Sequence, residues 1–200
     1  MASAAKKLYT PEEFLALERA AEYKSEYIDG QIYAMAGASY NHNTITVNMV
    51  IELGSQLRGR PCRVFSSDMR VKVNCTTYTY PDIAILCGEP QLDDGNLDAL
   101  TNPTIIIEVL SSSTEAYDRG TKFERYRKLP SLTEYVLVAQ NRVWVEHYTR
   151  HSDVPRQWTL EEMSELDDKL QLSSVACEVT LEAIYRGANF SEEDISARTL

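Results

Sequence analysis

The feature that most constrains the fold is the apolar run TIIIEVL at residues 104–110. Its β-branched residues, bounded by a proline before and serines after, predict a strand buried on both faces of a sheet. Because side chains alternate along a strand, Glu108 shares a face with Ile106 and Leu110. A carboxylate left unpaired there costs several kcal/mol, so Glu108 must be protonated, paired or metal-bound. Strand formation does not require an acid at this point, and Glu108 is therefore the first candidate functional residue.

Length and cysteine content indicate the general class of protein. Two hundred residues with 44% hydrophobic and 25% charged content suit one soluble globular domain. No apolar leader precedes Tyr9, and the cysteines form no CxxC pair, so we expect reduced thiols and a cytoplasmic protein. No apolar run approaches the roughly 20 residues that a membrane span needs, so we expect no membrane association.

The net charge of −10 restricts the possible partners. It opposes tight, sequence-independent binding to nucleic acid, since lysine and arginine supply most of that affinity. It does not exclude a phosphate-cleaving enzyme, because divalent cations neutralise clustered carboxylates. The charge lowers the expectation of a DNA-binding protein without removing it.

The pattern along the chain predicts a mixed α/β fold. A threonine–proline start, apolar spacing and glycine or proline ends predict helices over residues 10–23, 40–57, 115–129 and 181–185. The pair Asp29-Gly30 predicts a hairpin within residues 26–35. Other strands are expected over 62–65, 69–73, 80–86, 104–110, 134–139 and 142–148, with short strands or turns over 156–179. Residues 87–102 are expected to form a polar, acidic loop.

A second carboxylate lies at the mouth of another buried-type strand. Asp82 follows Pro81 and precedes an apolar run. If this strand neighbours the one that carries Glu108, the two acids converge on one divalent cation. Mg²⁺ prefers oxygen ligands and keeps several waters, so two carboxylates suffice, and the backbone carbonyl of Val109 can complete the protein's share.

The order of these motifs resembles the PD-(D/E)XK nuclease superfamily. Pro81-Asp82 is followed, 26 residues after the aspartate, by Glu108 and an aliphatic residue. The usual superfamily lysine lies two residues after the second acid, where this chain has Leu110. The resemblance therefore implies a lysine from elsewhere, and the following helix offers Lys122.

More narrowly, residues 10–186 are similar to the Uma-two family of predicted restriction endonucleases. The resemblance implies a single restriction-endonuclease-like domain over residues 1–186: a mixed β-sheet core flanked by helices, with an added N-terminal hairpin, C-terminal strands and a polar tail over 187–200. It also implies Mg²⁺ dependence, with Mn²⁺ as a substitute, DNA as substrate, and a homodimer. The motifs that carry it are EYIDG (26–30), MAGAS (35–39) with His42, YPDI (80–83), IEVLS (107–111), Ser113-Thr114, Asp118, Lys122, Tyr126 and Glu134-Tyr135.

The chemistry implied by the resemblance is metal-assisted phosphodiester hydrolysis. Asp82 and Glu108 hold the Mg²⁺, which polarises a phosphate oxygen and lowers the pKa of a bound water. Lys122 orients that water or stabilises the charge that develops on the phosphate. The remaining candidates bind a second metal, contact phosphate or orient the ligands, and they are Glu26, His42, Asp118 and Tyr126.

Three hypotheses stay open on the sequence alone. The first is the Mg²⁺-dependent endonuclease. The second is a catalytically silent nuclease-fold protein that binds or regulates a partner, favoured by the acidic composition and by Leu110. The third is another metal-assisted hydrolase that uses the same acids. Lys122 separates the first two: it lies four residues after Asp118 and can simply pair with it on an exposed helix face, or it can point toward Asp82 and Glu108.

Overall fold

The computed structural model describes residues 7–93 and 98–190. Three predictions from the sequence therefore fall wholly or partly outside the described residues. They concern the start of the chain (1–6), the middle of the acidic loop (94–97) and most of the polar tail (191–200). Within the described ranges no helix is long and apolar enough to cross a membrane.

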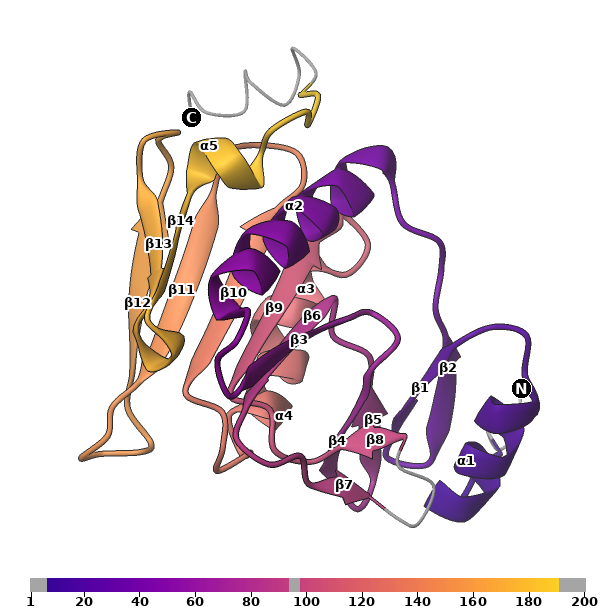
Figure 1. Ribbon diagram of the computed structural model, residues 1–200. Helices are drawn as coiled ribbons and strands as arrows, with labels where there is room; N and C mark the ends of the chain where they lie inside the picture. Colours follow the sequence, from indigo (N-terminus) through magenta and orange to yellow (C-terminus); the bar gives the residue numbers. More distant parts are fainter. Residues whose placement is uncertain (1–6, 94–97, 191–200) are drawn as a thin grey trace.

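Two six-stranded mixed sheets form the framework, which confirms the predicted mixed α/β class (Figure 1). The main sheet has the order β12 (Trp158–Met163), β11 (Val145–Arg150), β10 (Glu134–Ala139), β9 (Ile105–Leu110), β6 (Ile83–Cys87), β3 (Cys62–Ser66). The second sheet has the order β2 (Gln31–Ala34), β1 (Ser25–Ile28), β5 (Thr77–Thr79), β4 (Arg70–Asn74), β8 (Ala99–Leu100), β7 (Leu92–Asp93). A separate hairpin pairs β13 (Lys169–Leu172) with β14 (Cys177–Thr180).

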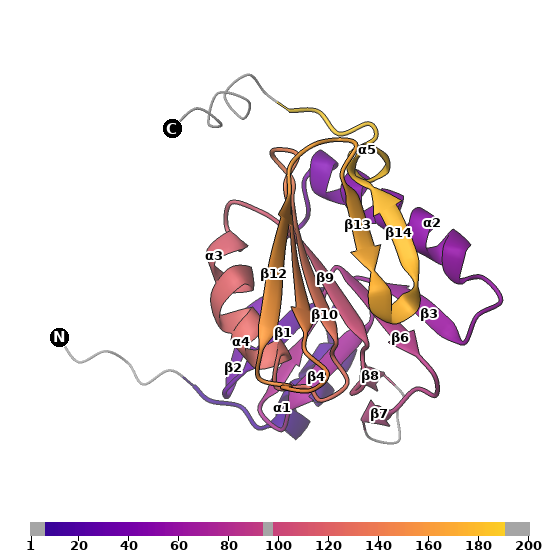
Figure 2. The same ribbon diagram turned by 90° about the vertical axis from the view of Figure 1, so that its left-hand side faces the viewer.

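Strand β9 lies at the centre of the main sheet, parallel to β10 and antiparallel to β6. All six of its residues are buried, as the apolar run predicts. One face, with Ile105, Ile107 and Val109, packs against the helix α2 (Tyr40–Leu57). The other face, with Ile106 and Leu110, belongs to the cluster that includes the helix α4 (Phe123–Tyr126). Figure 2 shows the sheet between these two helical layers. Glu108 is therefore on the α4 side.

The N-terminal elements form as their local sequence predicts. Helix α1 (Pro11–Ala20) begins with a capping box, in which the Thr10 and Glu13 side chains each accept the other residue's backbone N–H. The helix ends at Ala20 rather than near residue 23. The β1–β2 hairpin turns at Asp29 and Gly30, whose φ angles of 48° and 85° suit a two-residue type I′ turn.

The prediction of one regular helix over residues 115–129 is wrong. The segment consists of the short helix α3 (Glu115–Tyr117), the π-helical segment η1 (Asp118–Lys122) and α4. A π-helical turn is wider than an α-helical one and is found frequently at functional sites. The three pieces remain continuous, so Asp118 and Lys122 sit in the wide turn, with both side chains buried.

Several strand boundaries also differ from the prediction. Strands β5, β7 and β8 were not expected, and the last two fall within the predicted acidic loop. Strand β11 starts at Val145 rather than at residue 142. The region 156–179 contains β12, β13, most of β14 and a 3₁₀ turn, η2 (Ser173–Val175), and the helix α5 (Leu181–Ile184) follows it. These missed strands are two or three residues long, too short to show a period.

The expectation that all cysteines are reduced is wrong for two of them. Cys62 and Cys87 are direct cross-strand neighbours on β3 and β6 and form a disulfide, with a Cα–Cα distance of 4.0 Å. Their separation of 25 residues conceals this pairing in the sequence. Cys75 is a free, exposed thiol and Cys177 is free and buried. The cysteines therefore no longer support a cytoplasmic location.

A buried carboxylate–imidazole pair on the α2 side of the sheet gives a pH prediction. His147 Nε2 lies 2.6 Å from Glu134 Oε2, and the Ser174 backbone N–H donates to Glu134 Oε1 over 2.7 Å. Burial alone raises the pKa of Glu134, but the hydrogen bonds from His147 and Ser174 outweigh it and leave this pKa below its ordinary value of 4.5. The folded state therefore prefers the carboxylate, and its contribution to stability is present above pH 4.5 and lost as the pH falls through the lowered pKa.

We expect Glu134→Gln to lower the free energy of unfolding at pH 7 by about 1–3 kcal/mol. The difference in unfolding free energy between Glu134→Gln and the unmodified protein should shrink as the pH falls below about 4.5, because the Glu134 carboxylate is then protonated. Urea denaturation between pH 3 and pH 7 measures it, with the exposed Glu182→Gln as control. A difference that stays constant with pH would contradict the assignment.

Candidate active site

Asp82 and Glu108 lie side by side on adjacent strands. Strand β6 pairs with β9 in the register Ile83 to Ile107, which places Asp82, one residue before β6, beside Glu108. The Asp82 backbone N–H donates to Glu108 Oε2 over 3.3 Å, and the Val109 backbone N–H donates to Asp82 Oδ2 over 2.8 Å. Each carboxylate is therefore held by the backbone of the other's strand segment, and the two acids are fixed relative to each other.

Lys122 points into this cluster and not into solvent. Its ammonium Nζ lies 2.9 Å from Glu108 Oε1, 3.4 Å from Asp118 Oδ1 and 3.5 Å from Glu26 Oε1. The residue is only 6% exposed. Lys122 therefore pairs with Asp118, as the spacing of four residues allows, and it also reaches Glu108 on β9 and Glu26 on β1.

The cluster carries more acid than base. Three carboxylates, of Glu108, Asp118 and Glu26, contact the Lys122 ammonium, and a fourth, of Asp82, lies beside Glu108. Burial raises the pKa of Glu108 well above its ordinary value, and Asp118 and Asp82 raise it further against the opposing effect of Lys122. Burial also raises the pKa of Asp118. A site with this excess of negative charge favours the uptake of a cation.

The lysine itself remains charged. Burial alone lowers the pKa of Lys122, but the negative charge of Glu108, Glu26 and Asp118 outweighs this effect and raises the pKa well above its ordinary value. The site therefore holds a permanent positive charge next to the carboxylates, on the α4 side of the sheet.

Tyr126 completes the surroundings of Glu108. Its hydroxyl donates to Glu108 Oε1 over 3.1 Å and lies 2.9 Å from Thr79 Oγ1. Burial raises the pKa of Tyr126 well above its ordinary value, so the phenol stays protonated and remains a donor. Glu108 Oε1 thus contacts both the Tyr126 hydroxyl and the Lys122 ammonium, and these contacts fix the orientation of the carboxylate.

We expect Tyr126→Phe to cost about 1–3 kcal/mol of unfolding free energy, because it leaves Glu108 short of a donor and the buried Thr79 hydroxyl short of an acceptor. Affinity for Mn²⁺ should fall about 10- to 100-fold, the usual effect of losing a group that orients a ligand. Urea denaturation and calorimetry measure the two effects. Tyr148→Phe, whose hydroxyl donates to Glu146 outside the cluster, is the control and should leave Mn²⁺ affinity unchanged.

The remaining candidates also approach the two acids. His42, in the first turn of α2, places Nε2 3.2 Å from Asp82 Oδ2. Glu26, on β1, accepts the Tyr80 backbone N–H over 3.3 Å and the Tyr117 hydroxyl over 3.4 Å. The structure therefore brings the candidate site residues together, from the second sheet, the main sheet, α2, the segment η1 and α4.

Three residues of the cluster carried no sequence signal of their own. They are Thr79, which meets the Tyr126 hydroxyl, and Tyr80 and Tyr117, which both donate to Glu26. Tyr80 stands beside Pro81-Asp82, so its place in that motif was the available clue. Thr79 and Tyr117 depend on the packing of β5 and α3, which no local pattern encodes.

The donor set suits a hard divalent cation. In the described part of the chain no group of three or more His, Cys, Asp or Glu side chains is placed so that it could hold a metal ion. Two carboxylates on neighbouring strands match the needs of Mg²⁺, which keeps several waters and takes few protein ligands. They do not match a structural zinc site, which takes four nitrogen or sulfur ligands.

The mixed sheet, two acids on its adjacent central strands and a buried lysine from the next helix define a restriction-endonuclease-like α/β protein. The model of the Uma2 family, described as "Putative restriction endonuclease", matches residues 11–183. The chain belongs to the Uma2 family, and the resemblance seen in the sequence is confirmed.

Relatives support the same grouping. Two proteins of Synechocystis sp. carry the names "Uncharacterized protein slr1290" and "Uncharacterized protein sll1609". The first is 38% identical over 182 residues, covering 90% of this chain and 93% of the relative. The second is 40% identical over 174 residues, covering 86% and 97%. A crystal structure from Anabaena variabilis, described as "a putative nuclease belonging to DUF820", superposes with a TM-score of 0.72 over 88% of this chain and 97% of that one. At 23% identity this last likeness shows the shared fold.

Proposed function

We propose that this protein is a Mg²⁺-dependent endonuclease that hydrolyses DNA phosphodiester bonds. One observation supports this most strongly: Lys122 is buried and its Nζ lies 2.9 Å from Glu108, in the cluster that also contains Asp82. A lysine that served only the helix surface would pair with Asp118 in solvent. Family membership supports nuclease chemistry as the general class.

In this proposal Asp82, Glu108 and the backbone carbonyl of Val109 hold the Mg²⁺, and Mn²⁺ can substitute. When bound, the cation polarises a phosphate oxygen and lowers the pKa of a water, which supplies the nucleophile. The backbone N–H groups of Asp82 and Val109 keep the two carboxylates in place before the metal arrives. Such fixed ligands need no reorganisation when the substrate binds.

Lys122 acts on the substrate side of the cluster. Its ammonium is charged and water-excluded, so it stabilises the negative charge that develops on the phosphate oxygens, or holds the attacking water by a hydrogen bond. Asp118 and Glu26 hold the lysine within reach of Glu108. His42 lies against Asp82 and orients it, and Tyr126 does the same for Glu108.

Cleavage of supercoiled plasmid and of single-stranded DNA tests the proposal. The assay contains Mg²⁺ or Mn²⁺ and compares the unmodified protein with Asp82→Asn. Asp68→Asn is the control, because that acid is exposed and pairs with Lys24 outside the cluster. We expect metal-dependent nicking that is lost in Asp82→Asn and retained in the control. Equal cleavage by all three proteins would sink the assignment. Metal binding without cleavage of any nucleic acid would favour the catalytically silent binding module that the net charge of −10 also suits.

Two further proposals accompany the function. We propose a homodimer, because cutting both strands of a duplex requires two active sites; sedimentation at micromolar concentration tests it. We propose a cytoplasmic location because DNA is the expected substrate. A Cys62–Cys87 disulfide that is fully formed in cells would count against that location.

A further inference from the structure

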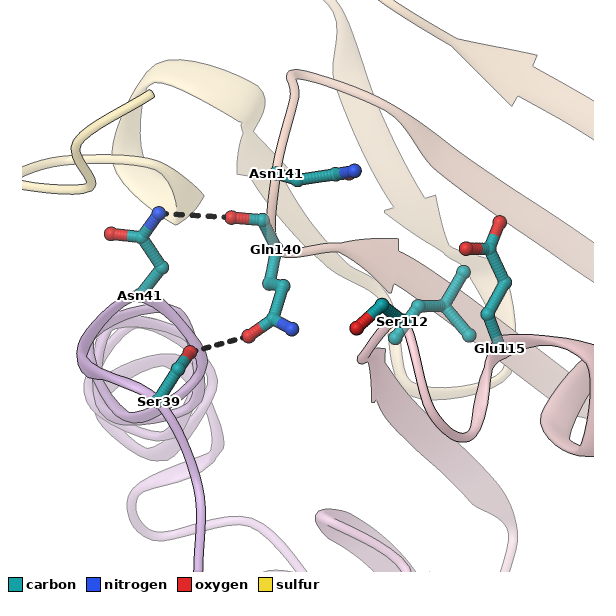
Figure 3. A pocket seen from close by; sticks show the side chains of 7 residues that line it. Ser39, Asn41, Ser112, Glu115, Gln140 and Asn141 are labelled. Atoms are coloured by element: carbon teal, nitrogen blue, oxygen red, sulfur yellow. Dashed lines mark hydrogen bonds between the residues drawn. The ribbon is translucent and has the colours of Figure 1, made fainter. Parts of the chain in front are cut away.

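A polar pocket of about 250 Å³ adjoins the acidic cluster. Its walls come from the start of α2, the end of β9, the serine loop with α3, and the turn that follows β10 (Figure 3). None of its lining residues belongs to the proposed metal ligands or to the groups that orient them. The pocket therefore needs its own explanation.

Two connections place this pocket next to the proposed site. Leu110 lines it and lies two residues beyond Glu108 on the same face of β9, which is about 7 Å along a strand. Ser39 also lines it and caps α2 by accepting the backbone N–H of His42, whose ring reaches Asp82. A chemical group in the pocket would therefore be a direct neighbour of a phosphate bound at Asp82 and Glu108.

Part of the pocket wall is held rigid by internal hydrogen bonds. The Ser39 hydroxyl donates to Gln140 Oε1 over 2.5 Å, and Asn41 Nδ2 donates to the Gln140 carbonyl over 3.0 Å and to the Asn189 carbonyl over 2.7 Å. Figure 3 shows the first two of these contacts between α2 and the turn after β10. They fix the position of residues 140–141 relative to the helix.

Other polar groups of the pocket are left for a ligand. Gln140 Nε2, the side-chain amide of Asn141 and the Ser112 hydroxyl bond to no group in the described part of the protein. The lining contains no cation, and its one acid, Glu115, is paired with Arg119. A phosphate is therefore a poor ligand for this space, whereas an uncharged group with both donors and acceptors is a good one.

We propose that the pocket binds the nucleobase next to the scissile phosphate and that Asn141 selects adenine. The inference rests on the proposed nuclease function, which supplies the neighbouring phosphate. A side-chain amide presents one donor and one acceptor, which matches the N6 amino group and N7 on the major-groove edge of adenine, and no other base presents that pair on this edge. Leu110, which is only 3% exposed, closes the inner end of the pocket, and single-stranded or flipped bases are read by edge contacts as well as by stacking.

Direct binding of nucleotides tests the pocket without any cleavage. The full chain is titrated with the 5′-monophosphates of the four deoxynucleosides while the side-chain amide signals of Asn141 and Gln140 are followed by NMR. We expect deoxyadenosine monophosphate to shift these signals saturably and to bind best. Asn141→Ala and Asn141→Asp, both exposed substitutions in a turn, should weaken it about tenfold or more. Gln171→Ala, an exposed amide on β13, should bind as the unmodified protein does.

Sequencing of cleavage ends from a random-sequence DNA pool gives the second measurement. We expect adenine to be enriched beside the cut in products of the unmodified protein and of Gln171→Ala, and not in those of Asn141→Ala. Equal binding of all four nucleotides, or unchanged binding and cut-site preference in Asn141→Ala, would overturn the pocket proposal while leaving the Asp82-dependent nuclease intact. Adenine-selective binding through Asn141 by a protein that cleaves nothing would support the pocket and reject the nuclease.

Discussion

Glu108→Gln is expected to abolish metal-dependent cleavage without destabilising the protein. Cleavage should fall at least about 100-fold, because even groups that only orient a metal ligand are worth about 10- to 100-fold. The free energy of unfolding in metal-free buffer should stay equal or rise, since burial and the neighbouring Asp118 and Asp82 raise the pKa of Glu108 and so disfavour its charged form. The amide keeps the shape of the side chain and an acceptor for Tyr126.

The combination of these two effects distinguishes a functional acid from a structural one. Plasmid cleavage and urea denaturation with chelator measure them side by side. The matched control is Glu124→Gln on α4, an exposed acid that pairs with Lys128, and it should change neither quantity by more than a small amount. A large loss of stability in Glu108→Gln with cleavage retained would show that Glu108 serves the fold.

Lys122→Met should also abolish cleavage, but unlike Glu108→Gln it should cause a large loss of stability. The substitution leaves Glu108, Asp118 and Glu26 without their shared cation, and an uncompensated buried charge costs about 3–5 kcal/mol. Removing one of the three acids that pair with Lys122 leaves the lysine with two carboxylate partners, whereas removing the lysine leaves all three acids without a cation. This asymmetry is why the two substitutions differ in sign.

Divalent cations should partly reverse the defect of Lys122→Met. Mg²⁺ or Mn²⁺ binds the folded state and stabilises it by mass action, and it should do so more strongly when the competing ammonium is gone. Thermal unfolding with chelator and with 10 mM Mg²⁺ measures the difference. Lys128→Met, at an exposed lysine in the turn that follows α4, is the control. A Lys122→Met protein that is as stable as the unmodified one, and insensitive to metal, would contradict the cluster's proposed energetics.

The central part of the fold was predictable because its signals are local. The apolar run of β9 has only one compatible environment, a sheet covered on both faces, and that environment made Glu108 conspicuous. The capping box at Thr10 and the turn at Asp29-Gly30 specify geometry within four residues. Asp82 came from its Pro-Asp motif and from the family resemblance, and its neighbour relation with Glu108 followed once β6 and β9 were paired.

The features that sequence did not reveal depend on distant contacts. Nothing in residues 118–122 distinguishes a π-helical turn from an α-helical one, because the difference lies in hydrogen-bond register. The Cys62–Cys87 bond joins residues 25 apart whose meeting requires the β3–β6 pairing. The pocket beside Leu110 is built from three separate stretches of the chain, and Asn141 gave no reason for attention until the turn after β10 was placed against α2.

The π-helical segment η1 affects how Lys122 and Glu108 are held in contact. A lysine two residues after the second acid would be positioned by a single strand, whatever else the protein did. Here the Lys122 ammonium and the Glu108 carboxylate belong to separate layers. Their 2.9 Å contact depends on the docking of a helix whose Phe123 stacks on Tyr135 and meets Trp158 of the outermost strand edge to face. Alignment of the proposed catalytic pair is thus a tertiary property, sensitive to any change that loosens the aromatic layer beneath the helix. Leu110, two residues after Glu108, lines the neighbouring pocket instead of carrying the lysine.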